Sequence, residues 1–351
     1  MSTGSETTAG QTQGPDAMGF AARARQTTAF WIFLCLLVIV GVFGVISPNH
    51  VFFSLSNLFT IALNAAELML LTVGMTYLLG AGQLDLSIGA NLTLSSVLAA
   101  MTIVSLAGTL DEVAAGDYPN LGWAVVAGTA VAVVTGTLFG VINGILVTRL
   151  RLSSFLVTLA TTGIGLGTTL VITHGANIPN LPRSLQTGFA VNRVFGVVPM
   201  PVILSLLVAA VFWFVLARTR FGIHTLAIGS SPEAASRAGI ATGRHLIVLF
   251  GLMGMLTGLA AMVDISRFAT TNIGGHQTDN LQAIAATVIG GTSLFGGVAS
   301  IPGAVIGTLV PVVLSTGLVI MRVDSFYQLI VVGIIIILAV YIDQRNRQSL
   351  K

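Results

Sequence analysis

Long stretches without a charged residue run along most of this chain, separated by short polar breaks. Divided at their Gly, Pro and polar positions, they accommodate ten segments of about the length that crosses one hydrocarbon core, roughly 20 residues. These segments lie near residues 29–46, 57–79, 85–107, 122–147, 153–173, 201–217, 246–263, 281–297, 300–320 and 326–342. The pattern predicts an all-α polytopic membrane protein in which some helices are broken or re-entrant.

Composition supports this fold class and adds the tails. Of the 351 residues, 54% are hydrophobic and only 8% are charged, whereas an average soluble domain is roughly 25% charged. Residues 1–28 are rich in Gly, Ser, Thr and Gln and contain no apolar run, which predicts a disordered cytoplasmic tail. We therefore expect one transmembrane domain over residues 29–343 and a short cytoplasmic tail over 344–351.

The distribution of basic residues orients the predicted spans. Ten crossings place both termini on one side, and 11 of the 15 basic residues fall there, so the positive-inside rule assigns both termini to the cytoplasm. The net charge of +3 reflects this asymmetry and does not argue for nucleic acid. The same assignment places six acidic residues in outward loops, where they either receive a basic partner surface or only keep the loops soluble. These residues are Asp111, Glu112, Asp117, Asp264, Asp279 and Asp324.

Several kinds of enzyme chemistry are disfavoured by the residues that the chain lacks. A Walker A loop needs a lysine to reach nucleotide phosphates, and the only lysine is Lys351. The five histidines show no HExxH motif and no pair at helical spacing, and the single cysteine, Cys35, excludes a disulfide within the chain. Proteolysis by two membrane aspartates would need a second buried Asp beside Asp85, and none is expected. We predict no enzymatic activity, no metal site and no cofactor in this chain.

An apolar stretch of span length, residues 70–94, contains a carboxylate near its centre, Asp85. Such residues usually face a protein-lined pathway, because burying Asp in lipid costs roughly 2.5 to 3.5 kcal/mol. Asp85 either contacts a substrate or caps a helix that begins at Leu86; both readings put a discontinuous helix at the pathway. Glu67, with Asn64 one turn earlier, is the other intramembrane candidate, for substrate contact or for a structural pairing. Residues 290–303 are expected to form a re-entrant or broken helix.

The longest cytoplasmic loop, residues 218–245, contains its own helix-start pattern. Ser231 is suited to the N-cap, Pro232 to the first helical position and Glu233 to the first turn, and Gly239 is placed as the stop. The pattern predicts a short helix of about two turns on the cytoplasmic face. It is either a docking element for a partner or a surface turn.

Three segments, in order, resemble bacterial ABC importer permeases for ribose and related simple sugars. The loop Leu226-Ala-Ile-Gly229, followed by Glu233-Ala-Ala235 and Gly239-Ile240, is similar to the coupling loop of that family. Val73-Gly-Met-Thr76 followed by Asp85-Leu-Ser-Ile-Gly89 is similar to its second and third spans. Ala283-Ile-Ala-Ala286 leading into Gly290–Gly297 is similar to its Gly-rich segment. Together the resemblance covers about residues 47–343.

The resemblance implies a permease subunit in the bacterial inner membrane that translocates a monosaccharide or polyol. It implies a second permease copy or close relative, two ATP-binding cassette subunits that carry ATP and Mg²⁺, and an extracytoplasmic sugar-binding protein. The expected coupling residues are Gly229, Ser231, Pro232, Glu233, Ala234, Ala235, Arg237 and Gly239. The expected pathway residues are Asn64, Glu67, Gln83, Asp85, Ser87, Asn91, Gln282, Thr292 and Ser293.

The chain departs from that family at two amides. Where relatives commonly have Gly before the hydrophobic residue and Asp, it has Gln83, and where an Asp often precedes Ala-Ile-Ala-Ala, it has Gln282. An amide both donates and accepts hydrogen bonds, so our hypothesis is that the two residues face the pathway and alter sugar preference. The alternatives are an ion-coupled secondary transporter that uses Glu67 and Asp85, and a channel or passive membrane protein.

Overall fold

The computed structural model describes residues 28–324, 327, 330–331, 333–334 and 337. In this part of the chain seven helices are long and apolar enough to cross a membrane. They are α3 (Leu55–Gly80), α4 (Ile88–Ala107), α6 (Leu121–Arg149), α7 (Ser154–Thr173), α9 (Met200–Arg218), α12 (Thr242–Phe268) and α14 (Ile301–Ile320). An eighth helix, α2 (Thr28–Ile46), matches the first predicted span. The last predicted span and most of both predicted tails lie outside the described residues.

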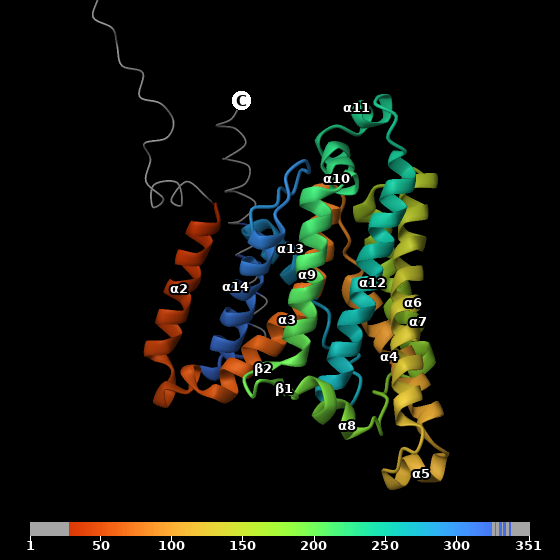
Figure 1. Ribbon diagram of the computed structural model, residues 1–351, viewed down its shortest axis with the longest axis vertical. Coiled ribbons are helices and arrows are strands. Elements are labelled where there is room, and N and C mark those ends of the chain that lie inside the picture. The colour runs from red at the N-terminus through yellow and green to blue at the C-terminus, as the bar shows by residue number, and fades with distance from the viewer. Residues whose placement is uncertain (1–27, 325–326, 328–329, 332, 335–336, 338–351) are drawn as a thin grey trace, which may run out of the picture.

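The shorter elements lie at the two ends of the helix bundle (Figure 1). Near one end are α10 (Arg220–Ser230) and α11 (Pro232–Arg237); at the opposite end are α5 (Leu110–Ala115), α8 (Arg183–Leu185) and the antiparallel pair β1 (Arg193–Val194) and β2 (Val198–Pro199). The remaining short elements are η1 (Pro48–Phe53), η2 (Gln186–Ala190) and α13 (Asp279–Ile289). Four arginines lie on or next to α10 and α11, and they mark that end as cytoplasmic by the positive-inside rule: Arg218, Arg220, Arg237 and Arg244.

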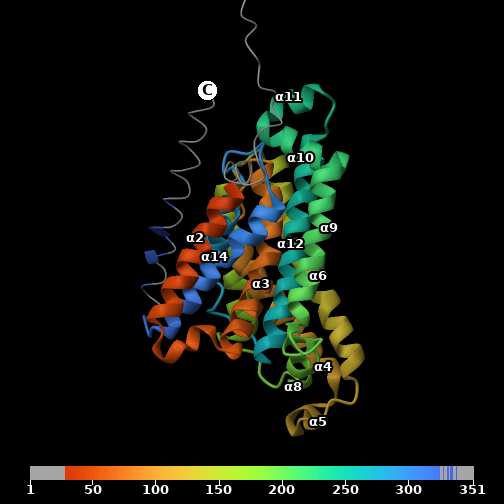
Figure 2. The same ribbon diagram turned by 60° about the vertical axis from the view of Figure 1, so that its left-hand side comes forward.

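Helix α3 lies at the centre of the bundle, and every residue from Leu68 to Gly80 is buried. Helices α9, α12, α13 and α14 contact it, while α4 and α6 pack on the far side of α12 and α7 packs on α4. Helix α2 lies at the edge, against α14 (Figure 2). The apolar core is therefore built mainly on α3, and many of the exposed apolar side chains lie on α2, α6, α7 and α9, as the lipid environment favours.

Helices α6 and α12 approach each other backbone to backbone. A methyl group on Gly136 would overlap the carbonyl oxygen of Gly254, and one on Gly254 would overlap the carbonyl oxygen of Gly136. Gly140 faces Phe250 in the same way, one turn along. Small residues at such spacing permit close packing of membrane helices, so glycine is required at this crossing.

Three predicted boundaries are corrected by the structure. Helix α4 begins at Ile88 rather than at 85 or 86. The crossing predicted at 281–297 is wrong as a continuous helix, because α13 ends at Ile289 and a non-helical connection runs over residues 290–300. The broken helix expected over residues 290–303 is present, since α14 begins at Ile301. Helix α12 continues to Phe268, five residues beyond its predicted end.

Candidate functional site

Two non-helical segments interrupt crossings of the bundle and meet inside it. Residues 81–87 connect α3 to α4, and residues 269–278 connect α12 to α13. The side-chain amide of Asn280, in the first turn of α13, donates to the carbonyl oxygen of Leu86 at 3.1 Å. The Gly89 Cα lies so close to the His276 carbonyl oxygen that a side chain would overlap it. The first turn of α4 and the connection before α13 are therefore in direct contact.

Side chains of α7 satisfy the backbone of the 81–87 segment. Ser154 Oγ accepts from the Leu84 N–H at 3.2 Å, and Thr158 Oγ1 accepts from the Leu86 N–H at 3.0 Å. Thr162 Oγ1 donates to the Leu86 carbonyl at 3.2 Å. Non-helical backbone is tolerated at membrane depth only where protein groups satisfy it, and these three residues fulfil that condition.

Asp85 is 2% exposed and binds within its own turn. Its Oδ1 accepts from the N–H of Ser87 at 2.8 Å and also from the Ser87 hydroxyl. Asn143 on α6 donates to the Ser87 hydroxyl oxygen at 2.9 Å. The prediction that Asp85 caps a helix starting at Leu86 is wrong in its position, because the helix starts at Ile88 with Ser87 as its N-cap. The carboxylate instead closes the turn that leads into α4.

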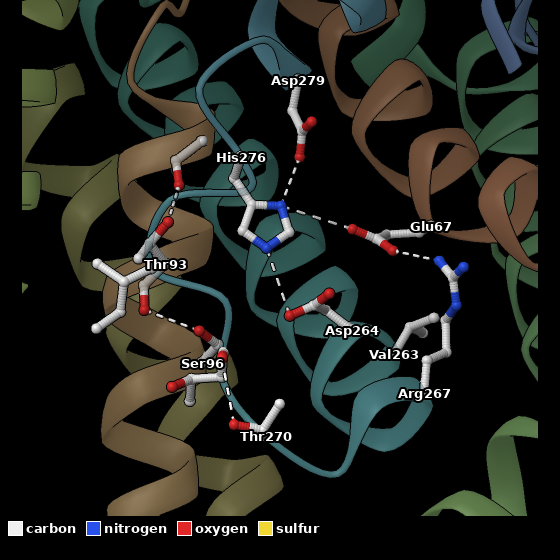
Figure 3. A network of polar contacts seen from close by, with 12 residues as sticks. Glu67, Thr93, Ser96, Val263, Asp264, Arg267, Thr270, His276 and Asp279 are labelled. Atoms are coloured by element: carbon white, nitrogen blue, oxygen red, sulfur yellow. Dashed lines mark hydrogen bonds and ion pairs between the residues drawn. The ribbon is translucent and has the colours of Figure 1, made fainter. Parts of the chain in front are cut away.

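A buried network of charged side chains holds residues 269–278, the connection between α12 and α13, in place (Figure 3). His276 lies between three carboxylates: its Nδ1 is 2.8 Å from Asp279 and 3.8 Å from Glu67, and its Nε2 is 3.4 Å from Asp264. On the other side of Glu67, the Arg267 guanidinium is 2.9 Å from the Glu67 carboxylate. It also donates to the amide oxygen of Asn64 at 2.6 Å. The network joins α3, α12, the connection and α13.

Two acidic members of this network lie elsewhere than the sequence predicts. Asp264 and Asp279 were expected in outward loops, but Asp264 lies on α12 and is 1% exposed, and Asp279 begins α13 beside His276. Asp85 is thus not the only buried aspartate, although the two carboxylates engage different partners. Two i, i+3 spacings in the sequence could have indicated these charge contacts: Asp264 with Arg267, and His276 with Asp279. The first spacing is informative only if α12 is extended past residue 263.

Glu67, His276 and Asp279 also offer three potential metal ligands within 4.8 Å of one another. The Arg267 guanidinium occupies one oxygen of Glu67, at 2.9 Å, and a fixed positive charge at that distance repels a cation. His276 Nδ1 already makes a hydrogen bond with Asp279. The arrangement fits an ion-pair network better than a metal centre.

Two cavities border the residues around the start of α13. One, of about 210 Å³, is lined by the polar residues Asn64, Glu67, Asp279, Gln282 and Ser315 together with three apolar side chains. The other, of about 180 Å³, has Thr93, Thr162, His276, Gln277 and Asn280 among its lining residues. Three of the expected pathway residues, Asn64, Glu67 and Gln282, are thus brought to a single cavity, and polar groups dominate its wall.

The remaining expected pathway residues lie elsewhere. Gln83 is half-buried in the non-helical segment 81–87 and lines neither of these two cavities. Asn91 is buried on α4, where its amide donates to the Gly136 carbonyl at 3.2 Å. Thr292 and Ser293 are buried in the connection between α13 and α14, where Thr292 Oγ1 accepts from the Ser300 N–H.

The predicted surface helix is present as α11. Ser231 accepts from the Ala234 N–H at 3.3 Å, Pro232 is at the first position, and Gly239 has a φ of 85° just after the helix ends. Ala235 is the buried residue of the helix, whereas Glu233, Ala234 and Arg237 are exposed. The predicted cap and stop are confirmed, and the helix projects from the end of the bundle (Figure 1).

Comparison with known proteins gives matches along most of the chain. Residues 57–340 match the family model described as branched-chain amino acid transport system / permease component. A ribose import permease protein of Bacillus subtilis is 36% identical over 90% of this chain and 92% of that protein. A D-allose transport system permease protein of Escherichia coli is 34% identical over 93% and 99%, and a fructose import permease protein of Rhizobium meliloti is 33% identical over 90% and 85%. No solved structure matches.

Proposed function

Because this chain belongs to the family of transport-system permease components, we propose that it forms the membrane route of an ATP-driven importer for a monosaccharide. The chain itself carries no lysine before residue 351 that could serve a nucleotide loop. ATP hydrolysis is therefore assigned to partner subunits. The relatives that carry ribose, allose and fructose support a sugar as substrate, and they disfavour the ion-coupled transporter.

The observation that carries this proposal is the exposure of α11 at the cytoplasmic end of the bundle. The helix is exposed on all sides except at Ala235, lies at the arginine-rich end and is capped by Ser231. It gives a partner on the cytoplasmic side a rigid element to hold. In this proposal the ATP-binding subunits bind α11 and displace it during their cycle.

The two interrupted segments supply the route. The N-terminal ends of α4 and α13 lie inside the bundle, and discontinuous helices of this kind form the substrate sites of many transporters. The cavity lined by Asn64, Glu67 and Gln282 offers hydrogen-bond donors and acceptors for hydroxyl groups. We assign these residues to the sugar pathway, and Asp85 to holding its backbone.

The end of the bundle opposite α11 is assigned to the sugar-binding protein. Helix α5 projects there with Asp111 and Glu112 in its first turn. Hydrogen bonds from the N–H and hydroxyl of Thr109 lower the pKa of Glu112, so its carboxylate is charged at neutral pH. This acidic surface suits a basic patch on the delivering protein.

Reconstitution tests the proposal. The chain, its ATP-binding subunits and its binding protein are placed in liposomes, and uptake of labelled ribose, allose and fructose is measured. We expect uptake of at least one sugar that requires ATP and the binding protein. Uptake by the chain alone under a proton or sodium gradient would contradict the proposal and favour a secondary transporter.

A further inference from the structure

We propose that Gly80, Gly229 and Gly297 form a backbone junction that transmits the displacement of α11 to the interrupted crossing at residues 81–87. The inference rests on the proposed function and adds to it the residues that couple the partner ATPases to the pathway. The junction joins three segments that are far apart in the sequence, and each of them contains one of the three motifs that resemble sugar permeases.

The three backbones are in direct contact. The Gly297 N–H donates to the carbonyl oxygen of Gly80, the last residue of α3, at 3.0 Å. A methyl group on Gly229 would overlap that same oxygen and would lie 2.6 Å from the nitrogen of Gly297. Gly229 is the penultimate residue of α10, two residues before the N-cap of α11. The end of α3, the end of α10 and the connection between α13 and α14 therefore touch without intervening side chains.

The contact contains no side chain that could absorb a displacement by changing its rotamer. Side chains change rotamer at little cost, whereas overlapping backbone atoms force whole segments to shift. Gly296 and Gly297 adopt φ values of 84° and 81°, a region that favours glycine, and a methyl group on Gly296 would lie 2.6 Å from the Gly229 carbonyl oxygen. Glycine thus serves both the turn and the close approach.

The junction leads directly into the candidate pathway. Gly80 is followed by the 81–87 segment, whose Leu86 carbonyl accepts from Thr162 on α7 and from Asn280 on α13. The Gly297 segment is the connection that ends α13 and begins α14. A movement of α11 through α10 therefore reaches both helices that start inside the bundle, α4 through residues 81–87 and α13 through residues 290–297.

Substitution of Gly229 distinguishes a role in coupling from a role in folding alone. Gly229→Ala places a methyl group on the Gly80 carbonyl, while Gly243→Ala, at the same end of the bundle, meets only Thr148 Cβ at 3.8 Å. In the reconstituted complex we expect Gly229→Ala to lower ATP-dependent uptake by about tenfold or more while ATP hydrolysis stays within about twofold. Gly243→Ala should leave both unchanged.

A reversible cross-link provides the second test. A methyl group on Gly80 would lie 3.1 Å from Ala299 Cβ, near the spacing of disulfide-linked Cβ atoms, about 3.5 to 4.5 Å. In a Cys35→Ser background, Gly80→Cys with Ala299→Cys should cross-link on oxidation, and the oxidised and reduced forms of this variant should take up sugar at the same rate, because the two positions move together.

The outcomes distinguish the two proposals. Absence of ATP-dependent uptake by the wild-type complex contradicts the proposed function itself. With an active wild-type complex, the junction is refuted if Gly229→Ala leaves uptake and hydrolysis as tightly coupled as before. It is equally refuted if the disulfide stops uptake and dithiothreitol restores it. Should Gly229→Ala fail to assemble, the cross-linked variant alone decides.

Discussion

The guanidinium of Arg267 lies 2.9 Å from the carboxylate of Glu67, and both side chains are almost fully buried at 10% and 12% exposure. This ion pair joins α12 to the central helix α3, and its Glu67 lines the same cavity as Gln282. A charge in this position is compensated by its partner rather than by water, so the pair cannot lose one member without a large penalty.

The first prediction concerns this pair. Arg267→Met leaves Glu67 buried with only the more distant His276 for compensation, and should destabilise the protein by about 3 to 5 kcal/mol. The double variant Arg267→Met with Glu67→Gln removes both charges and should recover a substantial part of that loss. Thermal unfolding of the purified protein in detergent measures both. A double variant as unstable as the sum of the two single variants would show that the pair does not interact.

The second prediction separates a structural from a substrate-binding role of Asp85. Asp85→Asn retains an oxygen that accepts from the Ser87 N–H and hydroxyl, whereas Asp85→Ala retains none. We expect Asp85→Asn to keep most of the uptake rate and Asp85→Ala to lose most of it, by about tenfold. Kinetics of sugar uptake measure this. A loss of the same size in Asp85→Asn, with a raised KM, would instead indicate contact with the sugar.

The third prediction concerns the two amides. Gln282 lines the polar cavity beside Glu67 and Asn64, and its amide donates to Thr278 Oγ1 at 3.2 Å. Gln282→Ala should therefore change the ratios of kcat/KM for the uptake of ribose, allose and fructose. The expected change corresponds to about 1 to 3 kcal/mol. Gln83→Ala is the comparison, because that side chain lines neither cavity. An unchanged order of preference in Gln282→Ala would count against the cavity as the sugar route.

The fourth prediction tests α11. Ser231→Ala removes the side chain that accepts from the Ala234 N–H and should weaken this short helix by about 1 kcal/mol. Co-purification of the ATP-binding subunits and sugar uptake should both decline. Ser231→Thr preserves the cap and is the matched control. Equal behaviour of the two variants would mean that the helix does not depend on its cap when the partner is bound.

Most of the membrane architecture could be predicted from the sequence. The apolar runs marked α3, α6, α7, α9 and α14 to within a few residues, because a helix that crosses the membrane is apolar over a full span length whether it faces lipid or the bundle interior. The short helix α11 was predicted from Ser231, Pro232 and Gly239, since cap and stop residues act locally. The resemblance to sugar permeases rested on motifs of the same local kind.

The network around His276 could not be predicted, because its members come from four segments. Apolar runs end wherever a charge appears, so Asp264 and Arg267 were assigned to a loop although they continue α12. A buried charge is acceptable only beside its partners, and Glu67 and His276 are 209 residues apart along the chain. The same limit applies to Gly80, Gly229 and Gly297, whose proximity depends on how three segments fold together.

The crossing of α6 and α12 also restricts how the protein can move. Where Gly136 faces Gly254, carbonyl oxygens sit against Cα atoms, and any rotation or sliding of one helix on the other would bring them into collision. Helix α4 packs on both α6 and α12. Helices α6 and α12 thus form one stationary body against which α4 packs, and conformational change during a transport cycle falls to α3, α4, α10, α13 and α14.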